Sequence, residues 1–521
     1  MFDIVIRDGE IIDGSRSPRR RADVGINGDR IAALGDLKDA DAGQVINAAG
    51  RVVAPGFVDV HNHSDGWLLK TPHLVSKTSQ GFTTEVIMAD GISYAPVSRR
   101  TAREWIYYLR GLNALRMEDY SGWESLADYM ALLDRRNAQN VIAQLPYANV
   151  RTLICGWDSD APDDLQMQLI QKQVEQGMEE GACALSTGLD YAAQCFASTA
   201  ELANACRPMA AAQAPYVTHM RYKTGILPAL QEAVEIGRRG GVPVHISHLK
   251  APSEADGEAI LDYVDRVAVH EVDFTFDVYP YLAGSTLLNY LLPYQIWRDG
   301  PFAALPKLHD PDMRAHIERS LPVHASDLDA VKIAWLPSKE NSCYQGKTLG
   351  HYVAAVGKSP TDALCDLLIE ENLAVLLVFF HGEDRFVEPF LAHEKYMMGT
   401  DGVFHEDATV HPRQYGSAAR LLGSCVRKGL FSLEEAVWKL SGAAANRFGL
   451  KERGLVKEGF YADLVVIDPD SVQDHATFEE PHRYSTGVGD VLVNGVAVIC
   501  DGAPLELAGP SLPGRAIRYR V

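Results

Sequence analysis

The sequence predicts an α/β protein, a (β/α)8 barrel of the TIM type with a small β-sandwich domain built from both ends of the chain. Two observations support this. Through the middle of the chain, short apolar β-branched runs alternate with helical patterns, which is typical of parallel βαβ units. Both ends instead show short strands separated by Asp-Gly and Asn-Gly turns.

The two β-rich ends favour a single sandwich, and two separate edge hairpins are the alternative. We expect residues 1–54 and 446–521 to form this sandwich and residues 55–445 to form the barrel. The expected N-terminal strands are 2–7, 10–13, 23–26, 30–34 and 44–47. The expected C-terminal strands are 462–467 and 488–499, the latter around an Asn494-Gly495 turn.

Nine segments are candidates for the eight strands of the barrel, so one of them must lie elsewhere. They are 56–60, 84–88, 141–145, 182–186, 216–219, 242–248, 274–278, 375–379 and 396–399. The pattern does not choose between them. A stretch from 287 to about 338, rich in aromatic residues and prolines, interrupts the alternation. We interpret it as an inserted subdomain that could act as a lid.

Composition excludes several classes of partner. The 49 basic and 69 acidic side chains leave a net charge of −20, which repels phosphate backbones, so no nucleic acid is expected. The eight cysteines are scattered and form no CxxC pair, so we expect no disulfide framework. The first residues, MFDIVIRDGE, carry charges where a signal peptide needs an apolar run, and no stretch is long enough to cross a bilayer. We therefore expect no membrane partner and a cytoplasmic location.

His61 and His63 follow the apolar run 54–60, at the end of the first candidate barrel strand. With one residue between them, their side chains point to the same side. Both imidazoles can then reach one ion, and neutral imidazole is a common ligand of zinc-like metals. Surface histidine pairs also arise by chance, but the strand-end position makes a metal site the stronger interpretation.

Four further polar residues end later candidate strands: Asp90, His219, His248 and Asp401. In a (β/α)8 barrel the carboxyl ends of all strands meet at one mouth, so residues distant in sequence can form one ligand shell. A lone histidine or aspartate at a strand end is more often a hydrogen-bonded structural group. A whole set placed this way by accident is much harder to explain, and it predicts a metal centre.

Such a centre indicates hydrolysis. A bound ion lowers the pKa of water, and a base must take the water proton and hand it to the leaving group. Asp401 suits that role because a carboxylate beside the ion can carry out both transfers. His245 alternates with the ligand face of its strand, so we expect it to pack or to support the ligands.

Longer motifs extend the pattern over nearly the whole chain. They are APGFVDVHNHSD at 54–65, GFTTEVIMADGIS at 81–93, LSTGLDY at 185–191, THMR at 218–221, GVPVHISHLK at 241–250, DVYPYLAGST at 277–286, GTDG at 399–402 and HPRQYG at 411–416. With these motifs the chain resembles the amidohydrolase superfamily, and within it the N-acyl-D-amino-acid deacylases, or D-aminoacylases.

The resemblance implies a metal-dependent enzyme that hydrolyses a linear amide, converting an N-acyl-D-amino acid and water to a carboxylate and a D-amino acid. It implies one or two Zn2+ ions or another divalent transition metal, and a small anionic substrate. By position, the implied metal ligands are His61, His63, His219 and His248, and the implied catalytic acid and base is Asp401. The implied substrate-binding residues are Lys250, Tyr279, Ser285, Tyr191 and Arg413.

Two segments depart from the family. Ala89-Asp90-Gly91 stands where relatives have Asn-Cys-Gly, so a carboxylate replaces a metal-binding thiolate. A carboxylate is a harder ligand that can bridge two ions, so we expect Asp90 to bind metal and leave the number and identity of the ions open. The alternative is that Asp90 binds nothing and the metal site is weakened. The segment 145–149 replaces a Gly-His pair of the relatives, which leaves the choice between linear and cyclic amides open.

Two other functions stay as alternatives. The first is a cyclic-amide or ureido hydrolase, similar to a hydantoinase or carbamoylase, that uses the same groups in a reshaped pocket. The second is a non-catalytic barrel that serves as a scaffold, although a scaffold has no need of converging metal-type residues. Assembly into a homo-oligomer is also left open.

Overall fold

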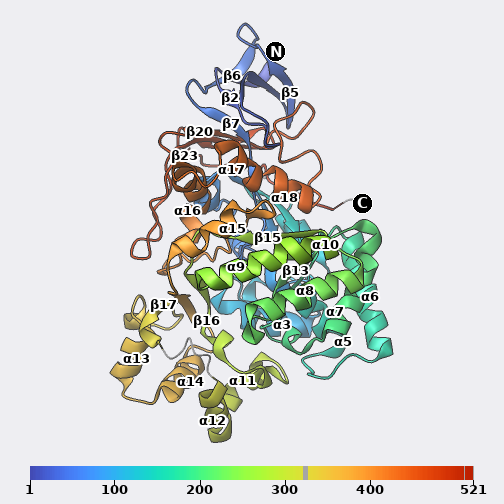
Figure 1. Cartoon of the computed structure of the whole chain (residues 1–521), viewed down its shortest axis with the longest axis vertical. Helices are drawn as coiled ribbons and strands as arrows, with labels where there is room; N and C mark the ends of the chain where they lie inside the picture. Colours follow the sequence, from blue (N-terminus) through green and yellow to red (C-terminus); the bar gives the residue numbers. More distant parts are fainter. Residues whose placement is uncertain (321–326, 508, 510, 520–521) are drawn as a thin grey trace.

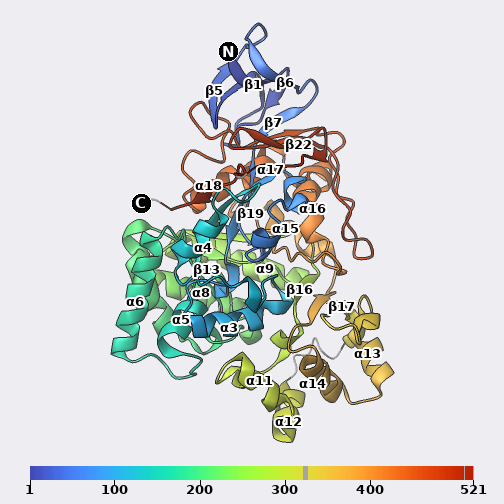
Figure 2. The ribbon, with the colours of Figure 1, turned by 180° about the vertical axis from the view of Figure 1, so that it is seen from behind.

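The structure is a computed structural model that describes residues 1–320, 327–507, 509 and 511–519. Residues 321–326 fall within the predicted insertion, and 508, 510, 520 and 521 fall within the predicted C-terminal part of the sandwich. These positions lie outside the described residues. Figures 1 and 2 both place the sheets formed by the chain ends at the top of the molecule. At the bottom lie helices α11 (Pro301–Leu308), α12 (Pro311–Ser320), α13 (Leu349–Val356) and α14 (Pro360–Glu370).

A closed barrel of eight parallel strands occupies the middle of the described chain. Its strands are β8 (Phe57–Asp59), β9 (Phe82–Ile87), β10 (Asn140–Ala143) continued by β11 (Leu145–Pro146), β12 (Leu185–Gly188), β13 (Tyr216–His219), β14 (Val244–Ile246), β15 (Phe274–Val278) and β19 (Tyr396–Met398). The Val60 amide donates to the Met398 carbonyl at 3.2 Å and so joins the first strand to the last. The predicted fold class is confirmed.

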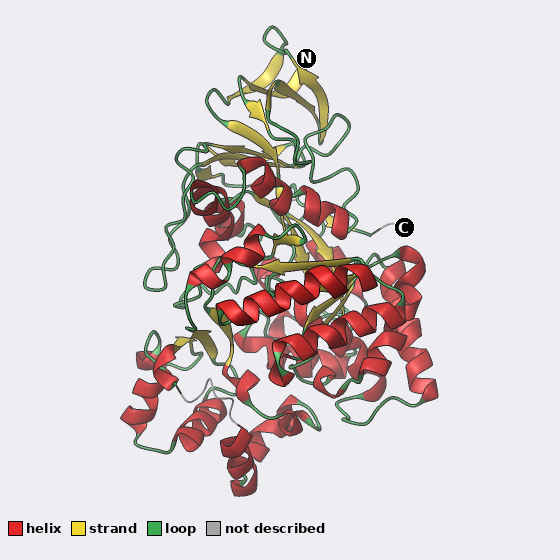
Figure 3. Cartoon of the chain, in the orientation of Figure 1, coloured by secondary structure: helices red, strands yellow, loops and turns green. Residues whose placement is uncertain are grey.

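Helices lie across the outside of these strands (Figure 3). They include α3 (Arg99–Tyr108), α4 (Leu126–Leu133), α5 (Tyr147–Cys155), α6 (Asp164–Glu179), α7 (Thr199–Cys206), α8 (Ile226–Gly240), α9 (Glu254–Tyr263), α16 (Arg413–Arg420), α17 (Leu433–Leu440) and α18 (Gly442–Arg447). Helix α8 shows why these segments are helical. Its buried face repeats at helical spacing, as Ala229, Leu230, Ala233, Val234 and Gly237. It ends at Gly241, whose φ of 72° is the left-handed conformation that glycine adopts without strain.

The segment 375–379 is not a barrel strand, which corrects one of the nine candidates. It forms β18 (Leu376–Phe379), which pairs antiparallel with β16 (Gly284–Leu287) and β17 (Val331–Trp335). Helices α11 (Pro301–Leu308), α12 (Pro311–Ser320), α13 (Leu349–Val356) and α14 (Pro360–Glu370) accompany this sheet (Figure 1). An apolar run predicts a strand but not the direction of its partner.

Both ends of the chain enter one sheet, as expected for a shared sandwich. Its order is β23 (Ala503–Pro504), β22 (Val496–Cys500), β21 (Val488–Val493), β20 (Leu464–Ile467), β7 (Val52–Pro55), β2 (Glu10–Ile11) and β3 (Arg20–Arg21). A second sheet holds β5 (Arg30–Gly35), β4 (Asp23–Asn27), β1 (Phe2–Arg7) and β6 (Ala42–Asn47). The last strand, β24 (Ala516–Ile517), instead pairs with β10 of the barrel. The domain boundaries stay predictions.

A buried charged network lies where the first barrel strand meets the last. Lys77, on α2 (Val75–Thr78), donates to the Asp59 carboxylate and to the Thr400 hydroxyl. The Thr400 amide donates to Asp59 Oδ1 at 2.8 Å. All three residues are fully buried, so neither charge has water to replace its partner. Within the described residues, no helix combines the length and the apolar character needed to span a bilayer.

Replacing Lys77 by methionine tests this network. Lys77→Met leaves the Asp59 carboxylate buried without a cation, so we expect the free energy of unfolding to fall by about 3–5 kcal/mol in urea unfolding followed by circular dichroism. Arg266→Ala, which breaks the exposed Arg266–Asp262 pair, is the control and should change it by about 0–1 kcal/mol. Equal effects of the two variants would contradict the assigned importance of the network.

Candidate metal centre

The barrel brings together all six polar residues that the sequence places at strand ends. His61 and His63 follow β8, Asp90 lies in the short helix η1 (Ala89–Gly91) after β9, His219 ends β13, His248 follows β14 and Asp401 follows β19. Each of these side chains is buried or nearly so. Their shared position at one mouth is the geometry that a ligand shell requires.

The backbone at this mouth adopts conformations that aim side chains inward. Asp90, His248 and Asp401 have φ values of 58°, 41° and 49°, in the left-handed region that residues with a side chain rarely adopt. Backbone bonds hold two of these turns, since the His248 amide donates to Asp277 Oδ1 at 2.9 Å and the Asp401 amide donates to the His61 carbonyl at 2.7 Å. Strain of this kind persists where the surrounding structure fixes it, and it concentrates at functional sites.

The ligand atoms form three overlapping groups, each with its atoms within 4.8 Å of one another. The groups are His61, His63 and Asp90; Asp90, His219 and His248; and His61, His248 and Asp401. Asp90 belongs to two groups that share no histidine, so its carboxylate links the two sides of the cluster. The first two groups share only Asp90 and offer two candidate ion positions, while the third takes one histidine from each and adds Asp401.

The spacing of these atoms suits a transition-metal ion. His61 Nε2 lies 3.5 Å from Asp90 Oδ1, and His63 Nε2 lies 3.7 Å from Asp90 Oδ2 and 3.1 Å from Asp401 Oδ1. Two ligand atoms bound to zinc at about 2 Å and at a tetrahedral angle lie about 3.3 Å apart. His61 Nε2 and Asp90 Oδ1 are buried and have no hydrogen-bond partner among the described residues. Because such atoms are costly to leave unpaired, the residues fit a bound divalent ion.

The charges of the cluster also fit a cation. Burial opposes ionisation of Asp90, but the neighbouring His61, His219 and His248 together outweigh burial and lower the pKa of Asp90 to about 2. Burial likewise opposes ionisation of Asp401, while Arg413 and then His61 hold the pKa of Asp401 well below its usual value. Burial lowers the pKa of His248 to about 3. Ionised carboxylates and a neutral imidazole are the forms that bind metal. Burial opposes ionisation of His61, but Asp90, Asp277 and Asp401 raise its pKa well above the usual value, so His61 must lose a proton when an ion binds.

Three residues around the ligands escape prediction from sequence. Asp277 Oδ2 lies 3.5 Å from His61 Nδ1 and 2.9 Å from Nε2 of the buried His245. Tyr222 contacts His248, and Asp190 contacts His219. Asp277 and Asp190 stand inside the motifs at 277–286 and 185–191, and Tyr222 directly follows THMR. Their position beside strand ends was therefore a signal that could have identified them.

Three of the predicted substrate-binding residues lie together beside Asp401. Lys250 Nζ donates to the Tyr279 hydroxyl at 2.7 Å and to the Leu282 carbonyl at 2.8 Å. The Arg413 guanidinium stacks on the Tyr279 ring, 4.3 Å from its centroid. Arg413 Nη1 also lies 2.8 Å from Asp401 Oδ2, as a salt bridge without hydrogen-bond alignment. Arg413 therefore places a positive charge beside Asp401, whereas burial and then Arg413 lower the pKa of Lys250 to about 7.

Tyr191 and Ser285 contact this region from other sides. The Tyr191 ring lies 4.6 Å from the His219 ring, and its hydroxyl lies 3.5 Å from Thr286 Oγ1. The Ser285 hydroxyl donates to the Leu377 carbonyl at 2.7 Å, and its own carbonyl accepts from Arg413. The Ser285 hydroxyl is thus bound to the neighbouring strand, whereas the Tyr191 ring contacts His219, one of the predicted metal ligands. The substrate roles of both residues stay predictions.

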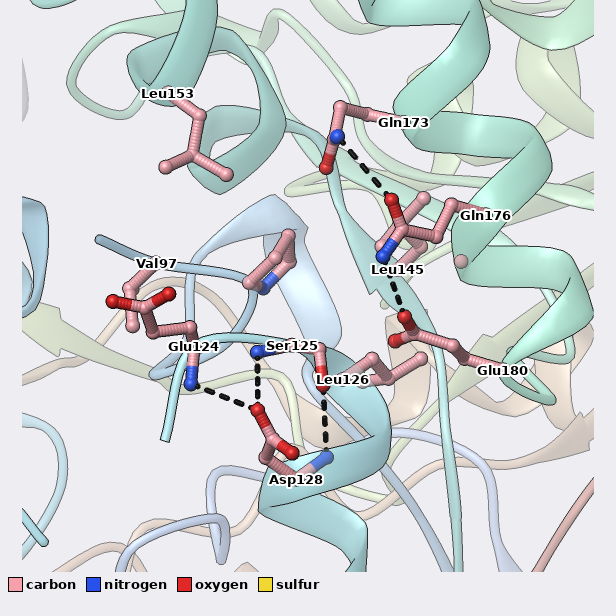
Figure 4. Close-up of a pocket in the computed structure, with 12 residues that line it drawn as sticks. Val97, Glu124, Ser125, Leu126, Asp128, Leu145, Leu153, Gln173, Gln176 and Glu180 are labelled. Atoms are coloured by element: carbon pink, nitrogen blue, oxygen red, sulfur yellow. Dashed lines mark hydrogen bonds between the residues drawn. The ribbon is translucent and has the colours of Figure 1, made fainter. Parts of the chain in front are cut away.

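A surface pocket between α4 and α6 is separate from this centre (Figure 4). Its lining, all within the described residues, includes none of the six metal-type side chains. Its polar groups bond to one another. The Ser125 hydroxyl accepts from the Asp128 amide, and the Gln176 side chain donates to the Glu180 carboxylate. This pocket is a groove between helix ends and offers no converging reactive groups.

A (β/α)8 barrel with histidines and carboxylates gathered at its mouth defines the class of metal-assisted hydrolases. A model of the amidohydrolase family matches residues 44–311 and 346–499. The chain belongs to this family.

Several relatives match over almost their whole length. The D-aminoacylase of Alcaligenes xylosoxydans xylosoxydans is 36% identical over 504 residues, covering 95% of this chain and 94% of that protein. The N-acyl-D-glutamate deacylase from Bordetella bronchiseptica, solved with zinc and a phosphonate inhibitor, has a TM-score of 0.83 at 31% identity and covers 99% of each chain. A D-aminoacylase with a binuclear metal centre has a TM-score of 0.80 at 33% identity, covering 99% of this chain and 100% of that chain.

The linking position of Asp90 leads to a prediction about metal content. Asp90→Ala removes the residue common to two ligand groups, so we expect the Kd of at least one Zn2+ ion to rise by about 100-fold or more. Inductively coupled plasma mass spectrometry of the dialysed protein measures the bound zinc. Glu406→Ala removes an exposed acid from the loop that follows Asp401 and should leave the zinc content unchanged. A wild-type zinc content in Asp90→Ala would exclude Asp90 as a ligand.

Proposed function

We propose that this protein hydrolyses N-acyl-D-amino acids to a carboxylic acid and a D-amino acid. The observation that carries the proposal is the buried cluster of four histidines and two aspartates at the barrel mouth, with Asp401 beside both histidines of the first strand end. The D-aminoacylase and N-acyl-D-glutamate deacylase relatives support this choice of substrate.

The cofactor in this proposal is Zn2+ or another divalent transition metal. His61, His63 and Asp90 would hold one ion, and Asp90, His219 and His248 would hold a second. The zinc complex and the binuclear centre of the relatives support this assignment. When bound, such an ion polarises the amide carbonyl and lowers the pKa of the attacking water.

Asp401 is the proposed acid and base. Its Oδ1 lies 3.1 Å from His63 Nε2 and 3.6 Å from His61 Nε2, so it borders the position where water would be activated. Arg413 holds the other oxygen and keeps the carboxylate ionised. An ionised carboxylate there takes the proton of the attacking water and passes it to the leaving nitrogen.

Lys250, Tyr279 and Arg413 are the proposed site for the carboxylate of the substrate. The Lys250 amine and the Tyr279 hydroxyl lie 2.7 Å apart and can both donate, and Arg413 adds a positive charge. Charge-assisted bonds from such donors hold a carboxylate strongly. An anionic small molecule would be oriented with its amide toward Asp401. A cytoplasmic location stays a prediction, and the oligomeric state stays open.

A substrate panel tests the function. Racemic N-acyl amino acids, hydantoins and ureido acids are supplied with zinc, manganese or cobalt, and products are separated by chiral chromatography. We expect release of D-amino acids alone from the N-acyl series, because a fixed carboxylate site and a fixed base accept one hand of the substrate. Activity confined to hydantoins or ureido acids would establish the alternative hydrolase. A metal-free, inactive protein would favour the scaffold.

Asp401→Asn tests the proposed base. The amide keeps the shape of the side chain but cannot accept the proton, so we expect kcat to fall by about 10^2–10^4-fold while zinc remains bound. Asp407→Asn, at an exposed position in the same loop, is the matched control and should keep wild-type kcat. Full activity of Asp401→Asn with bound zinc would remove Asp401 from the mechanism.

A further inference from the structure

Two histidines of the second ligand group face each other across the site. His219 Nδ1 lies 3.0 Å from His248 Nε2, and the group also contains Asp90. For both facing nitrogens to bind a cation, each ring must carry its proton on the opposite nitrogen, His219 Nε2 and His248 Nδ1. The contacts behind the two rings therefore decide whether this position is ready for an ion.

Tyr222 sets the proton of His248. The Tyr222 hydroxyl donates its proton to the Ser247 carbonyl at 2.9 Å, so it has no second proton to donate to His248. Its oxygen lies 3.2 Å from His248 Nδ1 and acts there as the acceptor. The His248 proton is therefore held on Nδ1, and the lone pair of Nε2 faces the site.

Asp190 occupies the corresponding place behind His219. Its Oδ2 lies 3.4 Å from His219 Nε2, and both side chains are buried. The contact is not aligned as a hydrogen bond, and Nε2 has no hydrogen-bond partner among the described residues. The negative charge of Asp190 nevertheless stabilises a proton on Nε2 over one on Nδ1, because Nε2 is the nearer nitrogen. The lone pair of Nδ1 then faces the site.

Asp190 is held from the far side by the segment that interrupts the barrel. The Tyr294 hydroxyl donates to Asp190 Oδ1, and the Tyr290 hydroxyl donates to Oδ2 at 3.2 Å. Both tyrosines lie in short helices after β16, η8 (Leu288–Leu291) and η9 (Tyr294–Trp297). The Lys223 amine lies 4.8 and 4.9 Å from their ring centroids, and the Lys223 backbone amide donates to Asp190 Oδ2 at 3.4 Å. The carboxylate thus has a fixed direction.

We propose that Asp190, which accepts hydrogen bonds from Tyr290 and Tyr294, is a positioning residue. It keeps the His219 proton on Nε2, so that Nδ1 is free to bind the second metal ion. The inference rests on the proposed function, since it assumes that the centre holds metal. It adds that the aromatic segment 288–297 controls the affinity of the ion at Asp90, His219 and His248. The ion at His61 and His63 has Asp277 behind it instead and should not depend on this segment.

Metal binding by single variants tests the proposal. Wild type, Asp190→Asn and Tyr294→Phe are freed of metal and titrated with Zn2+ by calorimetry, and the d–d absorption of bound Co2+ is recorded. We expect Asp190→Asn to weaken one ion by about 10–100-fold and to leave the other unchanged. Tyr294→Phe should weaken the same ion by a smaller factor, and the Co2+ spectrum of that position should change in both variants.

Tyr107→Phe is the matched control. It removes a buried tyrosine hydroxyl that has no hydrogen-bond partner among the described residues and whose ring packs on Phe302 of the same inserted region. It should bind both ions with wild-type affinity. Two ions bound to folded Asp190→Asn with unchanged affinity would overturn the inference and leave the proposed function intact. If Asp190→Asn does not fold, the test rests on Tyr294→Phe. An unchanged Kd for the ion at Asp90, His219 and His248 in that variant would also overturn the inference. Wild type that binds no Zn2+ would overturn both.

Discussion

The centre depends on the buried contact that joins the first barrel strand to the last. Asp59 receives hydrogen bonds from Lys77 and from the backbone and side chain of Thr400, all fully buried. Asp59 lies two residues before His61, and Thr400 lies next to Asp401. One network therefore sets the distance between a metal-type histidine and the proposed base, which are 340 positions apart in the chain. Because the charges cannot be solvated by water, the network tolerates little change in geometry.

This rigidity explains how strained residues persist at the mouth. Asp90, His248 and Asp401 each adopt a left-handed backbone conformation, which costs on the order of 1–3 kcal/mol per residue. The parallel ladder below them and the bonds from His248 to Asp277 and from Asp401 to His61 fix the turns. Side chains carried by rigid strand ends keep their positions better than side chains on free loops.

The local sequence pattern was sufficient to predict the barrel, its mouth and the six converging residues. Strand ends can be recognised in the sequence, and a (β/α)8 barrel brings the carboxyl ends of all its strands to one face. It failed at 375–379, where an apolar run pairs antiparallel with β16 outside the barrel, since strand direction is a tertiary property. It also missed Asp190, Tyr222 and Asp277. Their importance lies in which ring nitrogen they face, and that appears only when distant elements are packed together.

The carboxylate of Asp90 unites two halves that different parts of the fold support. On one side, His61 Nδ1 faces Asp277, and the His61 amide donates to Asp59 of the buried network. On the other, His219 is backed by Asp190, which depends on tyrosines of the inserted region. Asp90 Oδ1 lies 3.5 Å from His61 Nε2 and Oδ2 lies 3.7 Å from His63 Nε2, and the carboxylate also groups with His219 and His248. The support behind His219 therefore comes from the inserted region, whereas Asp277 of the barrel contacts both His61 and the His248 amide.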